Sequence, residues 1–322
     1  MYKKIMVPTD GSGLDRKAIL VALRVAERCG AKVLLVRVVT SGAYLDTEGI
    51  ERIASVGVLR AEHRAAHSEL NALVAECRNL SSAEISADLE EGPAAHVLER
   101  YAKLNGIDLI VISSHGRRGL ARLSLGSVTD SLIRGTTIPV LVVKANASYL
   151  TPEMSQEFHR IVVPLDGSSL AEQILDPVIP LAKLEGKEIV LLHVLAPLEE
   201  WYDEGESRRL PWWKKQVASA QAYLSSRADR IRLQGAAAKV DVVAGDNAAK
   251  AITDYARSEG ADLIAIATHG RGGLARVVRG SVADDVIKSS TCSILVLNPA
   301  KVIENALSED SLEGAVSLDV EA

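Results

Sequence analysis

Two clusters of small and polar residues have the composition and spacing of a phosphate-binding site. Asp10-Gly11-Ser12 follows an apolar run near the start of the chain. Ser113-Ser114-His115-Gly116 follows another apolar run and leads through nine residues to Gly126-Ser127. Ser127 is placed to cap a predicted helix over Val128–Arg134. The free N–H groups and the dipole at the start of such a helix favour a phosphate.

The loop between these residues strengthens the case for a phosphorylated ligand. Gly116 and Gly119 would let the backbone approach a ligand closely. Positive charge on the same loop comes from three arginines, Arg117, Arg118 and Arg122. A polyphosphate is the chemistry that this combination favours. The alternative is that the glycines only form turns and the arginines are solvated.

Both clusters recur in the second part of the chain. Asp166-Gly167-Ser168 repeats the first cluster, and Ala267-Thr268-His269-Gly270 leads to Gly280-Ser281 in the same way. The second loop carries its own arginines, Arg271, Arg276 and Arg279. This recurrence favours the ligand-binding interpretation over simple turns. Asp10 and Asp166 are also consistent with plain caps of the helices that follow them.

The recurrence extends over most of the chain and predicts a duplicated domain. Met6–Ser12 recurs 156 residues later as Val162–Ser168. Asp108–Ile133 recurs 154 residues later as Asp262–Ile287, with about 16 of 26 positions identical. This period is far longer than that of solenoid repeats. The expected units are a domain over residues 1–146, a second over 158–299, and an acidic, flexible tail over 300–322.

Each half is expected to alternate strands and helices. Segments of helical composition, such as Leu14–Arg28 and Pro93–Leu104, end near Gly30 and Gly106. The fold class is therefore α/β: two repeated, doubly wound, three-layer α/β/α domains around parallel sheets. Ligands of such sheets bind beyond the carboxyl ends of the strands, where both clusters fall. Short β-branched runs predict the strands of the first half at Lys4–Pro8, Lys32–Val39, Glu84–Leu89, Asp108–Ser113 and Pro139–Val143.

Composition excludes several classes of protein. Of the 322 residues, 48% are hydrophobic but only 3% are aromatic, which argues against a base-stacking platform for single-stranded nucleic acid. The net charge of −5 is carried by residues 301–322, so residues 1–300 have no net charge. They therefore lack the excess positive charge of a general DNA-binding protein. Three scattered cysteines predict neither disulfides nor a zinc site, and we expect no metal site at His115 or His269. The absence of a membrane-length apolar run or a signal-peptide pattern favours the cytoplasm.

These motifs together resemble the universal stress protein family in its tandem two-domain form. That family has a strand ending in Pro-x-Asp and a loop Gly-x2-Gly-x9-Gly-[Ser/Thr] that holds ATP phosphates. The first half reads Ser113-x2-Gly116-x9-Gly126-Ser127, and the second reads Ala267-x2-Gly270-x9-Gly280-Ser281, so a small residue replaces the first glycine in both. The resemblance covers nearly all of residues 1–300. It implies a five-stranded parallel sheet of order 3-2-1-4-5 in each half, of the adenine nucleotide alpha hydrolase type.

The resemblance also implies the ligand and its contacts. The cofactor would be ATP, AMP or ADP, with Mg²⁺ as a candidate companion, and adenosine would lie between strands one and four. Candidate binding residues in the first half are Pro8, Thr9, Asp10, Val38, Ile112, Ser113, Gly116, Arg117, Gly119, Gly126, Ser127 and Val128. Their counterparts are Pro164, Leu165, Asp166, Val194, Ile266, Ala267, Gly270, Arg271, Gly273, Gly280, Ser281 and Val282.

The expected function is a nucleotide-binding stress-response or signalling module that acts on a protein partner the sequence does not identify. One alternative is a slow ATPase that uses the same pocket, and another is a nucleotide-free scaffold. The obvious carboxylate of each site, Asp10 or Asp166, is expected at the adenosine end, which disfavours fast hydrolysis. A P-loop kinase is excluded because Gly-Lys-[Ser/Thr] does not follow the glycines.

Further features predict contacts between parts of the chain. Pro139–Val143 and Ser293–Leu297 would be exposed apolar edge strands in isolated domains. Because last strands pair antiparallel in the resembling family, we expect an intramolecular pseudo-dimer, with a homodimer using other surfaces. Residues 40–54 and 196–214 form long connections. The second holds every tryptophan, which suggests a lid or contact surface, or simply a partly buried helix start at Pro211.

Overall fold

The computed structural model describes most of both halves. Its described residues are 1–39, 43–45, 51–53, 56–114, 125–144, 160–197, 206–268 and 281–299. Both predicted phosphate loops and the acidic tail lie outside them. The candidate residues that fall outside are Gly116, Arg117, Gly119, Gly270, Arg271, Gly273 and Gly280, together with His115, His269 and Trp201.

The first half alternates strands and helices as its sequence predicts. Apart from a small antiparallel pair, β3 (Ala43–Leu45) with β4 (Glu51–Ile53), all its strands join one sheet. Gly30 ends α1 with a left-handed φ of 67°, which a residue without a Cβ adopts readily. The remaining elements are β1 (Lys4–Thr9), α1 (Arg16–Cys29), β2 (Lys32–Val39), α2 (Val56–Leu80), β5 (Glu84–Glu91), α3 (Ala94–Leu104), β6 (Leu109–Ser113), α4 (Ser127–Gly135) and β7 (Val140–Val143).

The second half repeats this order, but two helices follow its first strand where the first half has only α1. Helix α7 begins at Glu206, so Pro211, Trp212 and Trp213 lie inside the helix, and the predicted helix start at Pro211 is wrong. Pro211 is the sixth residue of this helix, beyond the first turn, so its missing N–H leaves one intrahelical hydrogen bond unmade. The elements are β8 (Arg160–Pro164), α5 (Ser169–Glu172), α6 (Leu175–Glu185), β9 (Glu188–Leu195), α7 (Glu206–Leu233), β10 (Ala237–Ala244), α8 (Ala248–Ser258), β11 (Leu263–Ala267), α9 (Ser281–Ser289) and β12 (Ser293–Leu297).

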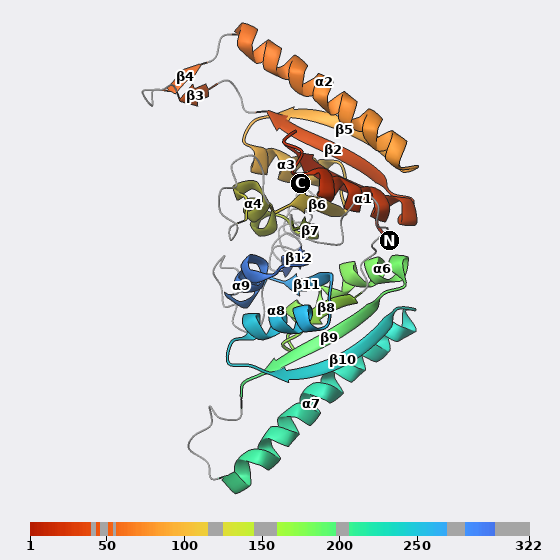
Figure 1. Cartoon of the computed structure of the whole chain (residues 1–322), viewed down its shortest axis with the longest axis vertical. Helices are drawn as coiled ribbons and strands as arrows, with labels where there is room; N and C mark the ends of the chain where they lie inside the picture. Colours follow the sequence, from red (N-terminus) through yellow and green to blue (C-terminus); the bar gives the residue numbers. More distant parts are fainter. Residues whose placement is uncertain are drawn as a thin grey trace, which may run out of the picture.

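All ten main strands form one sheet that runs through both halves (Figure 1). Its order is β10-β9-β8-β11-β12-β7-β6-β1-β2-β5. Within each half this is the expected order 3-2-1-4-5, and the pairing is parallel. The pair β12–β7 is antiparallel, with Leu295 opposite Leu141. The halves therefore share a sheet instead of forming two separate ones.

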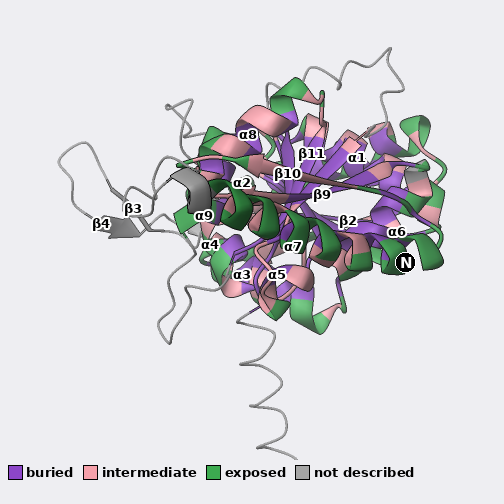
Figure 2. Ribbon diagram, turned by 90° about the horizontal axis from the view of Figure 1, so that it is seen from below, coloured by how far each residue is buried: buried purple, intermediate pink, exposed green. Residues whose placement is uncertain are grey.

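Successive side chains along the strands point alternately into two apolar layers, one on each face of the sheet. Ile5 and Val7 of β1 point into one layer, with α1, α2, α6 and α7, while Met6 points into the other, with α3, α4, α8 and α9. Both layers contain residues of both halves. Figure 2 shows the buried strands between helices whose outer surfaces are exposed. Within the described part of the chain, no helix is long and apolar enough to cross a membrane.

The halves also exchange polar contacts across the junction. The Nζ of Lys144 donates to the carbonyl of Ile287 near the end of α9, at 2.6 Å. In return, the Nδ2 of Asn298 donates to the carbonyl of Arg134 near the end of α4, at 2.9 Å. The hydroxyl of Tyr2 donates to the carbonyl of Pro177 in α6, at 2.6 Å. Each half thus satisfies carbonyl groups at helix ends of the other.

Burial of Lys144 makes the junction sensitive to pH. Burial lowers the pKa of Lys144 from 10.5 to about 8, so folding disfavours its charged form. Below pH 8 the lysine is charged in both states, and folding carries the full cost of burying that charge. Between pH 8 and 10.5 only the unfolded chain stays protonated, so this cost disappears as the pH rises.

We expect Lys144→Met to raise the free energy of unfolding relative to the parent chain most at pH 7, with the difference shrinking between pH 8 and 10. Urea unfolding of both proteins across this range measures the difference. Lys183→Met, in the last turn of α6, is the control and should give a difference that does not depend on pH in this way. Parallel curves for Lys144→Met and the parent would contradict the assignment.

Candidate functional site

The strand order reverses at β1 in the first half and at β8 in the second. Strand β1 pairs with β2 through Thr9 and Arg37, the full length of β1. Its pairing with β6 ends at Met6 and Ile110, although both strands continue for three more residues. The pairing of β8 with β11 also covers only two residue pairs. The carboxyl ends of β1 and β6, and those of β8 and β11, therefore separate from each other. An α/β sheet binds its ligands at such a point.

The aspartates that follow β1 and β8 have the same local geometry. An Oδ1 of Asp10 accepts from the backbone N–H of Ser12 at 2.8 Å, and that of Asp166 accepts from Ser168 at 2.9 Å. Neither aspartate is a helix N-cap: those positions belong to Asp15 and Ser168. The interpretation of Asp10 and Asp166 as plain caps is therefore wrong. Each instead turns the chain back at the carboxyl edge of the sheet.

Helix α4 begins directly beside the end of β6. The backbone N–H of Gly126 donates to the carbonyl of Ser114 at 2.9 Å, and the Oγ1 of Thr129 donates to the carbonyl of Ser113 at 3.1 Å. Gly126 is the N-cap residue, with extended φ and ψ of −60° and 146°. The first N–H groups of α4 thus start at the edge where β1 and β6 part.

The predicted capping role of Ser127 is wrong. A cap residue needs the extended backbone that Gly126 adopts, whereas Ser127 is already the first helical residue and is exposed. Ser281 is likewise the first residue of α9 and is exposed.

Apolar candidates line one side of this edge. Ile112 is buried in the layer that holds α3 and α4, and Val38 and Val128 pack against the same layer. In the second half Ile266 and Val194 do the same. The remaining described candidates differ in their exposure. Pro8 and Ala267 are buried, Ser113 and Pro164 are half-buried, and Val282 is exposed.

Three candidates, Thr9, Leu165 and Ala267, turn their side chains to the opposite layer. Thr9 Oγ1 donates to the carboxylate of Asp15, on the side of α1 and α2. Leu165 is buried in the layer with α5, α6 and α7. Because successive strand residues alternate between faces, these side chains cannot share a pocket wall with Val38 and Ile112. Any contact of these three residues with a ligand on that wall would have to come from the backbone.

Sequence reasoning missed two supporting residues, Ser114 and Thr268. Both are almost fully buried, at 1% and 2% exposure. Their backbone N–H groups donate to the last residues of the neighbouring strands, Val143 and Leu297. They thereby fix the point at which each predicted phosphate loop leaves the sheet. The available signal was a small hydroxyl residue at the same repeat position, directly after Ser113 and Ala267.

The cysteines lie away from this edge. Cys77 and Cys292 are buried, as expected for small apolar residues, and Cys29 is half-buried. Burial raises the pKa of all three thiols, which disfavours the reactive thiolate. Within the described ranges, no group of three or more His, Cys, Asp or Glu side chains gathers as a metal site.

Comparison with known proteins identifies the family. The model of the universal stress protein family matches residues 1–144 and again residues 157–298. The chain belongs to the universal stress protein family. Its two matched segments correspond to the two halves of the ten-stranded sheet, so this is a tandem member of the family.

Individual relatives agree with this assignment. A universal stress protein of Methanocaldococcus jannaschii is 33% identical over 146 residues, which cover 45% of this chain and 83% of the relative. One of Mycolicibacterium smegmatis is 25% identical over 301 residues, covering 92% and 97% of the two chains. The crystal structure of a universal stress protein from Archaeoglobus fulgidus has a TM-score of 0.67 at 18% identity, covering 92% and 98%. That structure supports the fold.

We expect Thr129→Val to lower the free energy of unfolding by about 1 kcal/mol, because it removes the hydrogen bond that ties α4 to the end of β6. Thr253→Val is a matched control: Thr253 is also buried, but its hydroxyl bonds only carbonyls of its own helix. Urea unfolding of both variants measures the difference. Equal losses would show that the α4–β6 hydrogen bond contributes nothing specific.

Proposed function

We propose that each half of this universal stress protein binds one adenine nucleotide at the parted carboxyl ends of its first and fourth main strands. The observation that carries the proposal is that the carboxyl edge of the sheet has the same arrangement in both halves. Both halves place an aspartate turn beside two strands whose pairing stops early, with a helix starting after the fourth strand. ATP, ADP or AMP is the ligand that the family resemblance implies.

In this proposal the two ends of the nucleotide meet different chemistry. Adenosine lies against the apolar wall of Val38 and Ile112, with the Asp10 turn at the ribose. The phosphates lie at the N-terminus of α4, where the helix dipole and free N–H groups favour negative charge. Gly116, Arg117 and Gly119 would complete the phosphate site from the loop, and Mg²⁺ would accompany the phosphates.

The nucleotide acts as a conformational ligand in a stress-response or signalling role. The carboxylate in the first turn of α4 is already engaged, because Asp130 pairs with Arg134 at 2.9 Å. Hydrolysis needs a free general base or a carboxylate for a metal ion. Acid extraction of the purified chain followed by chromatography separates the alternatives: bound ATP supports the ligand role, and ADP supports slow turnover.

We expect Gly126→Asp to reduce the number of ATP molecules bound per chain from two to one. A carboxylate at an N-cap is compatible with the helix, but it places negative charge where the phosphates should lie. Isothermal titration calorimetry on chain stripped of nucleotide measures the stoichiometry.

Two variants control this experiment. Gly126→Asn adds a similar side chain without the charge and should retain more affinity than Gly126→Asp. Asn247→Asp places a carboxylate at the N-cap of α8 in the second half and should leave the first-half site intact. A stoichiometry of two for Gly126→Asp would contradict a phosphate site at α4.

A further inference from the structure

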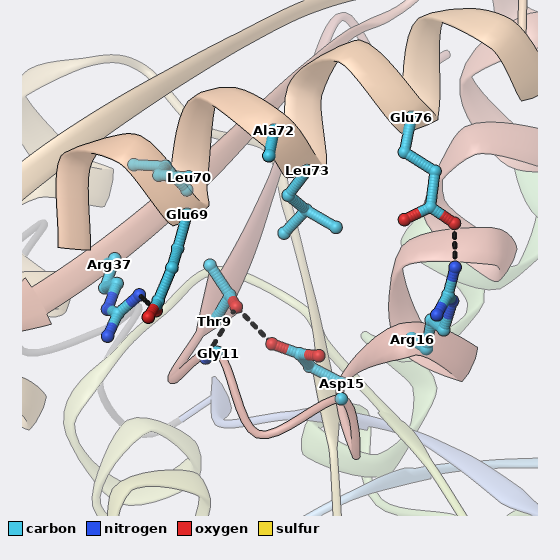
Figure 3. A pocket seen from close by; sticks show the side chains of 11 residues that line it. Thr9, Gly11, Asp15, Arg16, Arg37, Glu69, Leu70, Ala72, Leu73 and Glu76 are labelled. Carbon is cyan, nitrogen blue, oxygen red and sulfur yellow. Dashed lines mark hydrogen bonds and ion pairs between the residues drawn. The ribbon is translucent and has the colours of Figure 1, made fainter. Parts of the chain in front are cut away.

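The first half contains a cavity of about 300 Å³ on the other side of the sheet from Val38 and Ile112 (Figure 3). Its walls are the turn between β1 and α1, Arg37 of β2, and α2 from Glu69 to Glu76. Arg37 and Thr9 line it because they point to the face opposite their neighbours Val38 and Pro8. Its volume is at the lower end of the range for small-molecule sites.

The charges in this cavity do not balance. Arg37 pairs with Glu69 at 2.5 Å, and Arg16 pairs with Glu76. The fifth charged residue, Asp15, is 5% exposed, and its Oδ2 accepts from the hydroxyl of Thr9. Among the described residues it has no ion-pair partner. The N-terminus of α1 offsets part of its charge, but a buried carboxylate remains costly without a cation.

The second half has different side chains at the corresponding positions. Buried residues of α2 recur in α7 at a constant offset of 154 (Leu224 and Leu70, Ala228 and Val74). At this offset Leu73 corresponds to Arg227 and Glu69 to Tyr223.

Arg227, the counterpart of Leu73, forms an ion pair in the second half. Its Nε lies 2.8 Å from the carboxylate of Glu172, in the helix that follows β8. The Tyr223 hydroxyl donates to the same carboxylate at 2.9 Å, and the guanidinium lies 5.3 Å from the Tyr223 ring centre. The second half thus pairs a carboxylate after its first strand with a side-chain cation. At the offset of 156, Glu172 corresponds to Arg16 and Asp15 to Ala171. Asp15 is therefore a carboxylate that only the first half has, and the first half has a leucine in place of Arg227.

We propose that this cavity binds a small aliphatic ammonium ion. The ammonium group donates to the Asp15 carboxylate. The alkyl part lies against Leu70, Ala72 and Leu73 of α2, which Figure 3 shows above the carboxylate. The site differs from the nucleotide site in its face of the sheet, in its ligand charge and in occurring once per chain.

Calorimetric titration of the full chain with n-butylammonium chloride tests the proposal. We expect one molecule to bind per chain, while butyrate and 1-butanol, which match its size without its charge, do not bind measurably. Equal binding of 1-butanol would show a merely apolar cavity and would overturn the proposal. Competition by potassium chloride at equal concentration would identify an inorganic cation site and would overturn it as well.

Two variants place the ligand at Asp15. Asp15→Asn keeps the shape but removes the charge and should weaken butylammonium binding about 10-fold or more. Leu73→Arg places a guanidinium on the cavity wall and should abolish binding, because the guanidinium would occupy the site. Asp176→Asn, an exposed carboxylate in the first turn of α6, is the control and should bind as the parent does.

Circular dichroism and ATP titration establish that each variant is folded. If Leu73→Arg fails this check, Asp15→Asn decides the question alone. Unchanged butylammonium affinity in folded Asp15→Asn would overturn the proposal. ATP binding is expected to stay at two molecules per chain in Asp15→Asn, so failure of the ammonium site and failure of the nucleotide sites are distinguishable.

Discussion

The antiparallel pairing of β7 with β12 is the interaction on which the rest of the structure depends. Each strand is fully buried in the shared sheet, and Leu141 lies opposite Leu295. In a separate domain each would be an unpaired apolar edge. Pairing them inside one chain removes both edges and carries the two apolar layers through both halves. Lys144 and Asn298 then close the junction by capping helices of the opposite half.

This junction leaves the carboxyl edges of both half-sheets available. The strands that part, β1 from β6 and β8 from β11, lie one strand or more away from the junction and keep the same geometry in both halves. The elements that a nucleotide would need are therefore duplicated along with the fold. Membership of the universal stress protein family agrees with this conserved architecture, because the family match covers both halves equally.

Duplication has also allowed the halves to diverge where the fold does not constrain them. Between the first two helices of each half, the second half builds a compact group of Glu172, Tyr223 and Arg227, whereas the first half leaves a cavity beside Asp15. Both solutions keep the apolar packing of Leu70 and Leu224. The same scaffold can therefore carry a filled polar core in one half and an open charged site in the other.

The sequence by itself determined the duplication, the strand and helix pattern and the family, because these depend on local periodicity and on short motifs. It also located the carboxyl-edge clusters, since Asp10 and Ser114 follow predicted strands and Gly126 precedes a predicted helix. Only the tertiary structure decided which face each side chain takes. The family motif places Thr9 beside Val38 among the expected nucleotide contacts, but the alternation of side chains along β1 turns Thr9 toward Asp15 and α2. The capping role went to Gly126 instead of Ser127 because it depends on one pair of backbone angles. The cavity at Asp15 is formed by residues from β1, β2, α1 and α2, and no spacing in the sequence brings such distant positions together.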